Sequence, residues 1–260
     1  MDPRRPAPAL PLPTSRFVSR APARAAALAW ASLLACLCGA QKVAAQTVAS
    51  NVKHSQPEAG GYGPDHLPQL RAEDDPLVDA GEAIPGLILD LRYATPDNFT
   101  GKPLYPPGMR CLLRRSVAER LAGAARELAA RKLRLVAWDC SRPPSVQQIL
   151  FRAWPHPGSV ADPKRGSLHE RGVAIDAGLA DLQGNLVPLP TPFDTFGPRA
   201  AARAPMPDGP AKENRDLLAA AMYRAGFRPN PREWWHFARL YGFRWPLLRD
   251  EDLGLKPASR

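Results

Sequence analysis

The spacing between His169 and Asp176, in the segment SLHERGVAID at residues 167–176, is the feature that most constrains the fold. Residues seven apart point to opposite faces of a strand, and on a helix they lie about 10 Å apart along the axis. Both side chains can therefore reach one metal ion only if the chain bends between them. Gly172 can make that bend without steric cost. The segment predicts a loop carrying His169, followed by a buried strand from Val173 that delivers Asp176.

A second segment, EWWH at residues 233–236, supplies another imidazole and a carboxylate three residues before it. Two neutral imidazoles and one carboxylate leave one position of a tetrahedral zinc ion open, which is typical of a hydrolytic rather than a structural site. We therefore expect His169, Asp176 and His236 to bind one Zn2+ ion per chain. Glu233 is expected to stand beside the ion without ligating it, because a fourth protein ligand would exclude water.

The N-terminal region, residues 1–45, has the layout of a secretory signal peptide. Basic residues precede an Ala- and Leu-rich apolar run at 25–40, and the small residues VAA stand at 43–45. The apolar run is short for a transmembrane helix. We expect cleavage near the end of this leader, a secreted or periplasmic protein, and no membrane span afterwards. A lipid anchor at Cys36 is the alternative.

Charge and cysteine content change when this leader is removed. It carries six basic residues and one acid, so the formal net charge falls from +10 to +5. A mildly basic domain is attracted to an anionic cell envelope, whereas no aromatic-interleaved basic strip indicates nucleic-acid binding. Cys111 and Cys140 remain after cleavage. The residues leave two interpretations open, a disulfide or two small buried apolar side chains.

The remaining sequence predicts one α+β domain at residues 84–248. It follows a flexible polar arm at 46–83, interrupted by Gly and Pro, and precedes a polar tail at 249–260. A capping box, SVAE at 116–119, is expected to open the first helix. Hydrophobic periodicity predicts helices at 116–131, 145–154 and 212–225, and strands at 87–92, 133–138, 173–176, 227–228 and 234–240.

The two metal-site segments together give Ser-x-His-x-x-Gly-x-Ala-x-Asp followed by Glu-x-Trp-His. This pattern resembles the zinc D-alanyl-D-alanine peptidases, which share a fold with hedgehog signalling domains. Upstream, DLRYAT at 90–95, NFTG at 98–101 and WD at 138–139, followed by RP at 142–143, look like the D-Ala-D-Ala dipeptidases of the VanX type. The resemblance spans roughly residues 84–245. It implies a single α+β domain whose small, mainly antiparallel sheet carries the zinc site, with helices packed against the sheet.

The resemblance also implies roles in catalysis. Glu233 is the general base for metal-bound water, and Arg142 stabilises the oxyanion, with Asp139 nearby to orient it. The implied zinc ligands are the three residues predicted above. Ser141 stands where the family often carries a tyrosine before this Arg-Pro pair, which is a departure in the pocket wall.

Recognition of substrate is implied for three further residues. Asp194 and Ser167 hold the free amino end of a dipeptide, and Tyr93 lines the pocket. A carboxylate that pairs an ammonium selects against longer chains whose amine is acylated. Glu170 and Arg171, by contrast, are expected to be solvated loop residues.

The implied activity is zinc-dependent hydrolysis of the D-alanyl-D-alanine dipeptide to free D-alanine. One alternative is a D,D- or L,D-carboxypeptidase acting on peptidoglycan stem peptides. Another is a non-catalytic zinc-bearing binding module, which would require neither a base nor an oxyanion donor. The sequence leaves open the oligomeric state and whether the activity serves recycling, nutrition or resistance.

Overall fold

The computed structural model describes residues 68–156 and 158–255. The predicted leader at 1–45, including Cys36, lies outside the described residues, as does the part of the predicted arm at 46–67. No helix in the described part of the chain is long and apolar enough to cross a membrane.

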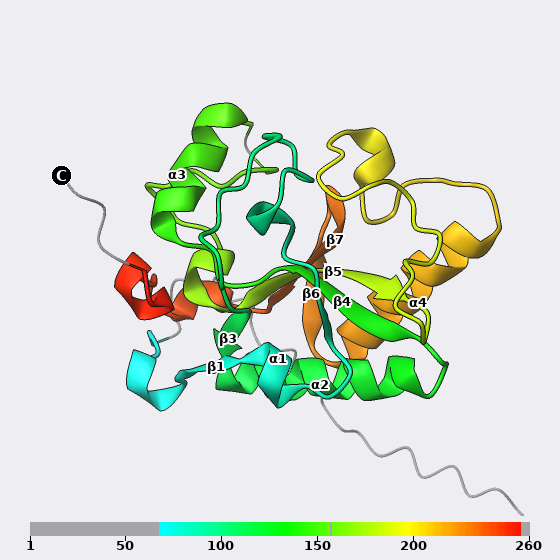
Figure 1. The fold of residues 1–260 in the computed structure, drawn as a ribbon, viewed down its shortest axis with the longest axis horizontal. Coiled ribbons are helices and arrows are strands. Elements are labelled where there is room, and N and C mark those ends of the chain that lie inside the picture. The colour runs from blue at the N-terminus through cyan, green and yellow to red at the C-terminus, as the bar shows by residue number, and fades with distance from the viewer. Residues whose placement is uncertain (1–67, 157, 256–260) are drawn as a thin grey trace, which may run out of the picture. The chain divides into compact units, whose positions relative to one another are not determined.

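A five-stranded sheet forms the centre of the domain (Figure 1). In spatial order the strands are β2 (Ile88–Leu89), β4 (Arg134–Asp139), β5 (Ala174–Ala180), β7 (Glu233–Arg239) and β6 (Phe227–Asn230). Strand β2 runs parallel to β4, and the other neighbouring strands are antiparallel. A separate antiparallel pair joins β1 (Leu77–Asp79) to β3 (Leu112–Arg114). The predicted α+β class with a mainly antiparallel sheet is confirmed.

Two long helices cover the sheet. Helix α2 (Arg115–Ala129) and helix α4 (Pro210–Arg224) pack on each other, and they contact β4 and β5 respectively. Their buried apolar residues recur at helical spacing, including Leu121 and Leu128 in α2 and Leu218 and Met222 in α4. The short helix α1 (Ala80–Ala83) contacts α2. These helices and strands share one core.

Helix α3 (Pro144–Ala153) lies on the other side of the molecule from α2 (Figure 1). It buries Val146 and Leu150 in a second, smaller cluster with Tyr93, Tyr105 and Val160. This cluster supports the loops that surround the functional site.

The prediction of a flexible arm is wrong for residues 68–83. Strand β1 pairs with β3, Ala80 is fully buried, and the carboxylate of Asp75 accepts hydrogen bonds from Ser116 N–H (2.9 Å) and Ser116 Oγ (2.7 Å). Asp75 therefore accepts a free backbone N–H at the start of α2, and the predicted capping box does not form. A three-residue strand held by a distant partner leaves little periodicity in the sequence.

The predicted tail is also wrong for residues 249–255. A 3-10 turn, Asp250–Leu253, buries Leu253 against Leu112 and Leu248. Strand β3 was not predicted. The other helices and strands after residue 83 lie within a few residues of their predicted bounds, except for the strand expected at 87–92. That strand is limited to Ile88–Leu89, because the chain turns into a 3-10 turn at Arg92–Ala94.

Candidate active site

Neighbouring strands bring two of the predicted ligands together. Asp176 in β5 is the direct register partner of His236 in β7. His169 begins a 3-10 turn that ends at Gly172, whose φ of 71° is left-handed. A left-handed residue is where glycine avoids the steric cost of a Cβ. The chain thus bends at the glycine between the two segments, and His169 turns back toward β5.

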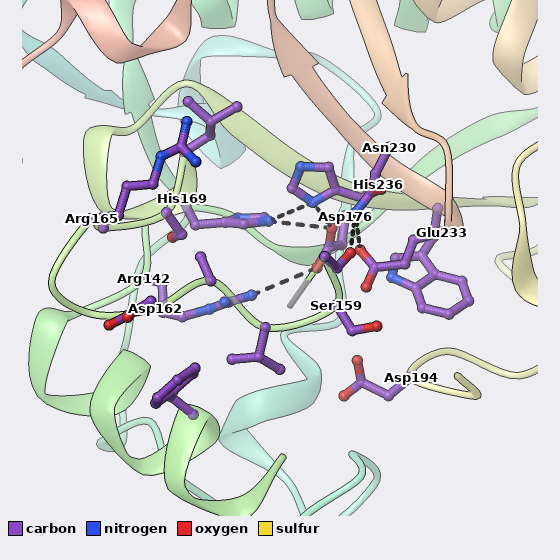
Figure 2. A pocket seen from close by; sticks show the side chains of 18 of the residues that line it. Arg142, Ser159, Asp162, Arg165, His169, Asp176, Asp194, Asn230, Glu233 and His236 are labelled. Atoms are coloured by element: carbon purple, nitrogen blue, oxygen red, sulfur yellow. Dashed lines mark hydrogen bonds and ion pairs between the residues drawn. The ribbon is translucent and has the colours of Figure 1, made fainter. Parts of the chain in front are cut away.

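The three side chains form one compact group of metal-ligand atoms (Figure 2). Asp176 Oδ1 lies 3.0 Å from His236 Nδ1 and 3.3 Å from His169 Nε2, and the two ring nitrogens are 3.0 Å apart. Two imidazole nitrogens and one carboxylate oxygen are a donor set that suits zinc. Burial would raise the pKa of Asp176, but the adjacent imidazoles of His169 and His236 outweigh it and hold this pKa below its usual value.

The backbone next to the site orients the His169 ring. Its Nδ1 lies 2.7 Å from the carbonyl oxygen of Cys140, which can only accept, so Nδ1 carries the hydrogen and Nε2 presents its lone pair to the group. Cys140 is joined to Cys111 by a disulfide, with the Cα atoms 5.2 Å apart. Of the two interpretations left open by the sequence, the structure therefore has the disulfide. It holds the end of β4 beside the start of β3.

Arg142 is buried and held from two sides. Its Nε and Nη2 donate to Asp139 Oδ2 at 3.0 and 2.6 Å, and Nη1 donates to Gln147 Oε1 at 2.8 Å. Tyr105 also donates to Asp139. A register shift in β4 makes Asp139 the partner of Asp176, as bulges beside functional sites often do. Burial would lower the pKa of Arg142, but Asp139 raises it well above its usual value, so the charge is permanent.

Ser141, the departure noted in the pocket wall, turns away from the site. Its Oγ donates to the carbonyl oxygen of Leu112 at 2.5 Å. The sequence offered no signal for Tyr105 or Gln147, because neither belongs to a motif. Tyr105 lies 34 residues before its partner Asp139, whereas Gln147 lies five residues after Arg142.

A cavity of about 440 Å³ opens onto the ligand group. Glu233 is buried in its wall, and its carboxylate points toward the group (Figure 2). Asn230 Nδ2 donates to Glu233 Oε2 at 2.8 Å, a contact that the sequence did not predict. Burial raises the pKa of Glu233 to about 8, although the nearby His236 opposes the shift. Trp235 is buried and also lines the cavity.

Asp194 lines the same cavity from a loop. Tyr93 donates to its Oδ1 at 3.3 Å, and the Phe99 N–H donates to its Oδ2 at 3.4 Å. Its φ of 58° is left-handed, an arrangement that aspartate tolerates better than most residues. Burial, and then repulsion from Asp176, raises the pKa of Asp194 to about 7.

Ser167 also lines the cavity, and a neighbour fixes its position. Its N–H donates to Glu170 Oε2 at 2.6 Å, while its Oγ accepts from the Glu170 N–H at 3.2 Å. Glu170 is buried, so the expectation of a solvated residue is wrong. Arg171 is only partly solvated, since its side chain donates to the carbonyl oxygen of Trp245. Both residues stabilise the turn that carries His169.

Comparison with known proteins places this geometry in a family. A family model described as D-ala-D-ala dipeptidase matches residues 73–241. A D-alanyl-D-alanine dipeptidase of Escherichia coli strain K12 is 39% identical over 175 residues, covering 67% of this chain and 90% of the relative. Dipeptidases of the same description from Enterococcus faecium and Enterococcus faecalis are 31% and 32% identical, covering 65% and 60% of this chain and 90% and 87% of the relatives.

Proposed function

This chain belongs to the D-Ala-D-Ala dipeptidase family and is a peptidase, and we propose that it hydrolyses D-alanyl-D-alanine to two molecules of D-alanine with one zinc ion. One observation carries the proposal. A metal-ligand group, a buried glutamate, a buried arginine and a buried aspartate all line a single cavity. The residues are His169, Asp176 and His236, then Glu233, Arg142 and Asp194.

The ion would be held by the two histidines and Asp176, with Cys140 keeping His169 in the tautomer that leaves Nε2 free. A bound zinc ion lowers the pKa of water, polarises a peptide carbonyl and favours the carboxylate form of a neighbouring acid. Members of this family are metallopeptidases, and the donor set of this chain fits that chemistry.

Glu233 is proposed to be the general base. Its carboxylate faces the ligand group, and the Asn230 amide holds one of its oxygens, leaving the other free to accept a proton. A base in this position takes a proton from water and delivers it to the leaving amine. A non-catalytic binding module would not need a buried carboxylate beside its metal, so this contact favours the enzyme.

Arg142 is proposed to stabilise the negative charge that develops on the carbonyl oxygen. Its Nη2 lies 3.9 Å from Asp176 Oδ2, which places the guanidinium beside the ligand group. Asp139 and Gln147 fix its orientation before substrate binds, so little reorganisation is needed. A preorganised donor of this kind contributes about 3 kcal/mol in the transition state.

Asp194 is proposed to bind the substrate's free ammonium, with Tyr93 orienting the carboxylate and Ser167 contributing its hydroxyl. A buried carboxylate gains most from an ionic partner and is costly beside an uncharged amide. This favours a dipeptide over the acylated stem peptides that a carboxypeptidase would cleave.

We propose in addition that the mature protein is secreted or periplasmic. The leader at residues 1–45 has the composition of a signal peptide, and a disulfide such as Cys111–Cys140 persists in oxidising compartments. Fractionation and the N-terminal sequence of the mature protein test this; an intact leader in the cytoplasm contradicts it.

The test of activity uses the full chain, expressed with its leader and purified with its metal. Zinc content and D-alanine release are measured on the same sample, with D-Ala-D-Ala and N-acetyl-D-Ala-D-Ala as substrates. We expect one zinc per chain, rapid release from the dipeptide and little from the acetylated compound. A protein that holds one zinc and leaves the dipeptide intact would overturn the proposal. Preference for the acetylated compound would instead support a carboxypeptidase.

A further inference from the structure

We propose that Arg165 binds the C-terminal carboxylate of the substrate and makes the enzyme selective for a free carboxylate at that end. The inference rests on the proposed dipeptidase function, and it assigns a role to a residue outside the motifs that identified the site. Arg165 lies in the loop that precedes Ser167 and lines the same cavity as the metal-ligand group.

The cavity wall contains positively charged side chains. Arg142 and Arg165 are the cationic side chains that line it, and Arg142 is already bonded to Asp139 and Gln147. Among the described residues Arg165 makes no ion pair with a carboxylate. Asp162, an acid at the same wall, uses Oδ1 to accept the Lys164 N–H at 2.9 Å. Because Arg142 is assigned to the developing oxyanion, Arg165 is the cation of the cavity wall that remains for a terminal carboxylate.

Arg165 is held by a backbone turn and by contact with an aromatic ring. The N–H groups of Arg165 and Gly166 both donate to the carbonyl oxygen of Asp162, at 2.9 and 3.0 Å, which closes a turn. The Arg165 guanidinium lies 5.2 Å from the ring centroid of Phe243, and the Arg171 guanidinium lies 5.3 Å from the same centroid. Such a contact holds the positive charge over the ring without using a hydrogen-bond acceptor. The N–H groups of the guanidinium can therefore bind a carboxylate through two hydrogen bonds.

The cavity has side chains of opposite charge on its two sides. Figure 2 shows Arg165 on one side of the ligand group and Asp194 on the other. D-Ala-D-Ala is a zwitterion, with its ammonium at one end and its carboxylate at the other. A dipeptide with its ammonium toward Asp194 therefore directs its carboxylate toward the Arg165 side and places the scissile carbonyl near the metal ligands. The charges of the cavity and of the substrate are complementary in this one direction.

The experiment compares D-Ala-D-Ala with D-Ala-D-alaninamide, which keeps the ammonium and the scissile bond but has no terminal charge. Both are assayed with the zinc-loaded full-length protein and with the variants Arg165→Gln, Arg165→Lys and Lys164→Gln. Lys164 is an exposed cation next in sequence that does not line the cavity, so its variant controls for the loss of one positive charge. Zinc content and melting temperature are recorded for each protein.

We expect Arg165→Gln to raise KM for the dipeptide about tenfold, the size expected of one charged hydrogen-bond partner at a partly solvated site. Its kcat for the dipeptide and both constants for the amide should change by less than about twofold. Arg165→Lys should recover part of the loss because the charge is retained, and Lys164→Gln should match the wild type. The selectivity of the wild type for the free carboxylate should fall by the same factor in Arg165→Gln.

The outcomes separate this inference from the proposed function. If the wild type cleaves the dipeptide and Arg165→Gln affects dipeptide and amide equally, or neither, the role of Arg165 is overturned and the dipeptidase stands. An equal effect of Lys164→Gln reduces Arg165 to a contribution to overall charge and also overturns the inference. If the zinc-loaded wild type cleaves neither compound, both proposals fail together.

Discussion

The two sides of the active-site cavity are built in different ways. On the strand side, Asp176, His236 and Glu233 project from β5 and β7, whose pairing fixes their separation. On the loop side, Asp194 and Arg165 project from irregular segments held by side-chain hydrogen bonds, packing and turns. In the proposed function, the strand side, together with His169 and Arg142, carries the groups that the chemistry requires, and the loop side carries those that recognise the ends of the substrate. This difference indicates that kcat and selectivity can be changed separately.

Burial follows this division only for Arg165. The side chains of His169 and Asp176 are 2% and 4% exposed, so changes there leave uncompensated polar groups in the interior. On the loop side, Arg165 is exposed, whereas Asp194 is buried in the cavity wall. Variants on the strand side should therefore affect the reaction itself, whereas variants on the loop side should change which molecules react.

The largest expected effect is that of Glu233→Gln on the strand side. The amide fills the same space but cannot accept a proton, so kcat should fall about 10²- to 10⁴-fold. Zinc content should stay at the wild-type level because the three ligands are unchanged. Steady-state kinetics and metal analysis on one sample measure both. Loss of zinc together with activity would mean that Glu233 supports the metal site rather than catalysis.

The strand side was largely predictable from the sequence because its groups lie in short motifs with fixed spacing. The bend at Gly172 followed from spacing and residue type, and the meeting of His169, Asp176 and His236 from residue type together with the family resemblance. The roles of Arg142 and Asp139 came from resemblance to a family. Sequence reasoning succeeded where local spacing encodes the contact.

Contacts made by residues in loops and turns were less predictable, because the sequence does not show which partner such a side chain meets. Asp75 lies in a segment rich in turns but bonds to Ser116, 41 residues away. Glu170 was expected to be solvated, yet it is buried: its carboxylate accepts the Ser167 N–H, and its backbone carbonyl oxygen accepts the Leu248 N–H. Charged side chains in loops are usually exposed, and only the three-dimensional contacts identify the exceptions.

On the loop side, the largest effect is expected of Asp194→Asn. The variant keeps the shape of the side chain but removes the charge that would pair the ammonium. We expect kcat/KM for D-Ala-D-Ala to fall about 10- to 100-fold, with little change for N-acetyl-D-Ala-D-Ala. Competition between the two substrates measures the ratio directly. An equal loss on both substrates would mean that Asp194 acts in the reaction itself rather than in binding the ammonium.

A smaller effect should come from pH. Burial raises the pKa of Asp194 to about 7, so the acid becomes neutral as pH falls through this value and loses its attraction for an ammonium. Of the charges around it, Asp176 raises this pKa, while Arg142 lowers it. We expect kcat/KM for the dipeptide to fall about tenfold between about pH 8 and 6. The Asp194→Asn variant should not show this fall in kcat/KM between pH 8 and 6. An unchanged profile in the variant would assign the titration to another group.

The smallest expected effect on activity is that of Glu170, which touches no substrate in the proposed arrangement. Glu170→Ala leaves the buried N–H of Ser167 without an acceptor, which costs about 1–3 kcal/mol of unfolding free energy. Because Ser167 becomes less well fixed, KM should rise only a few-fold, while kcat stays near that of the wild type. Glu170→Gln keeps an oxygen that can accept this N–H, so it should recover most of the stability. Chemical denaturation and kinetics on the two variants test this. If Glu170→Ala lowered kcat as strongly as Glu233→Gln, the loop would be part of the chemical machinery, and the division between the two sides of the cavity would fail.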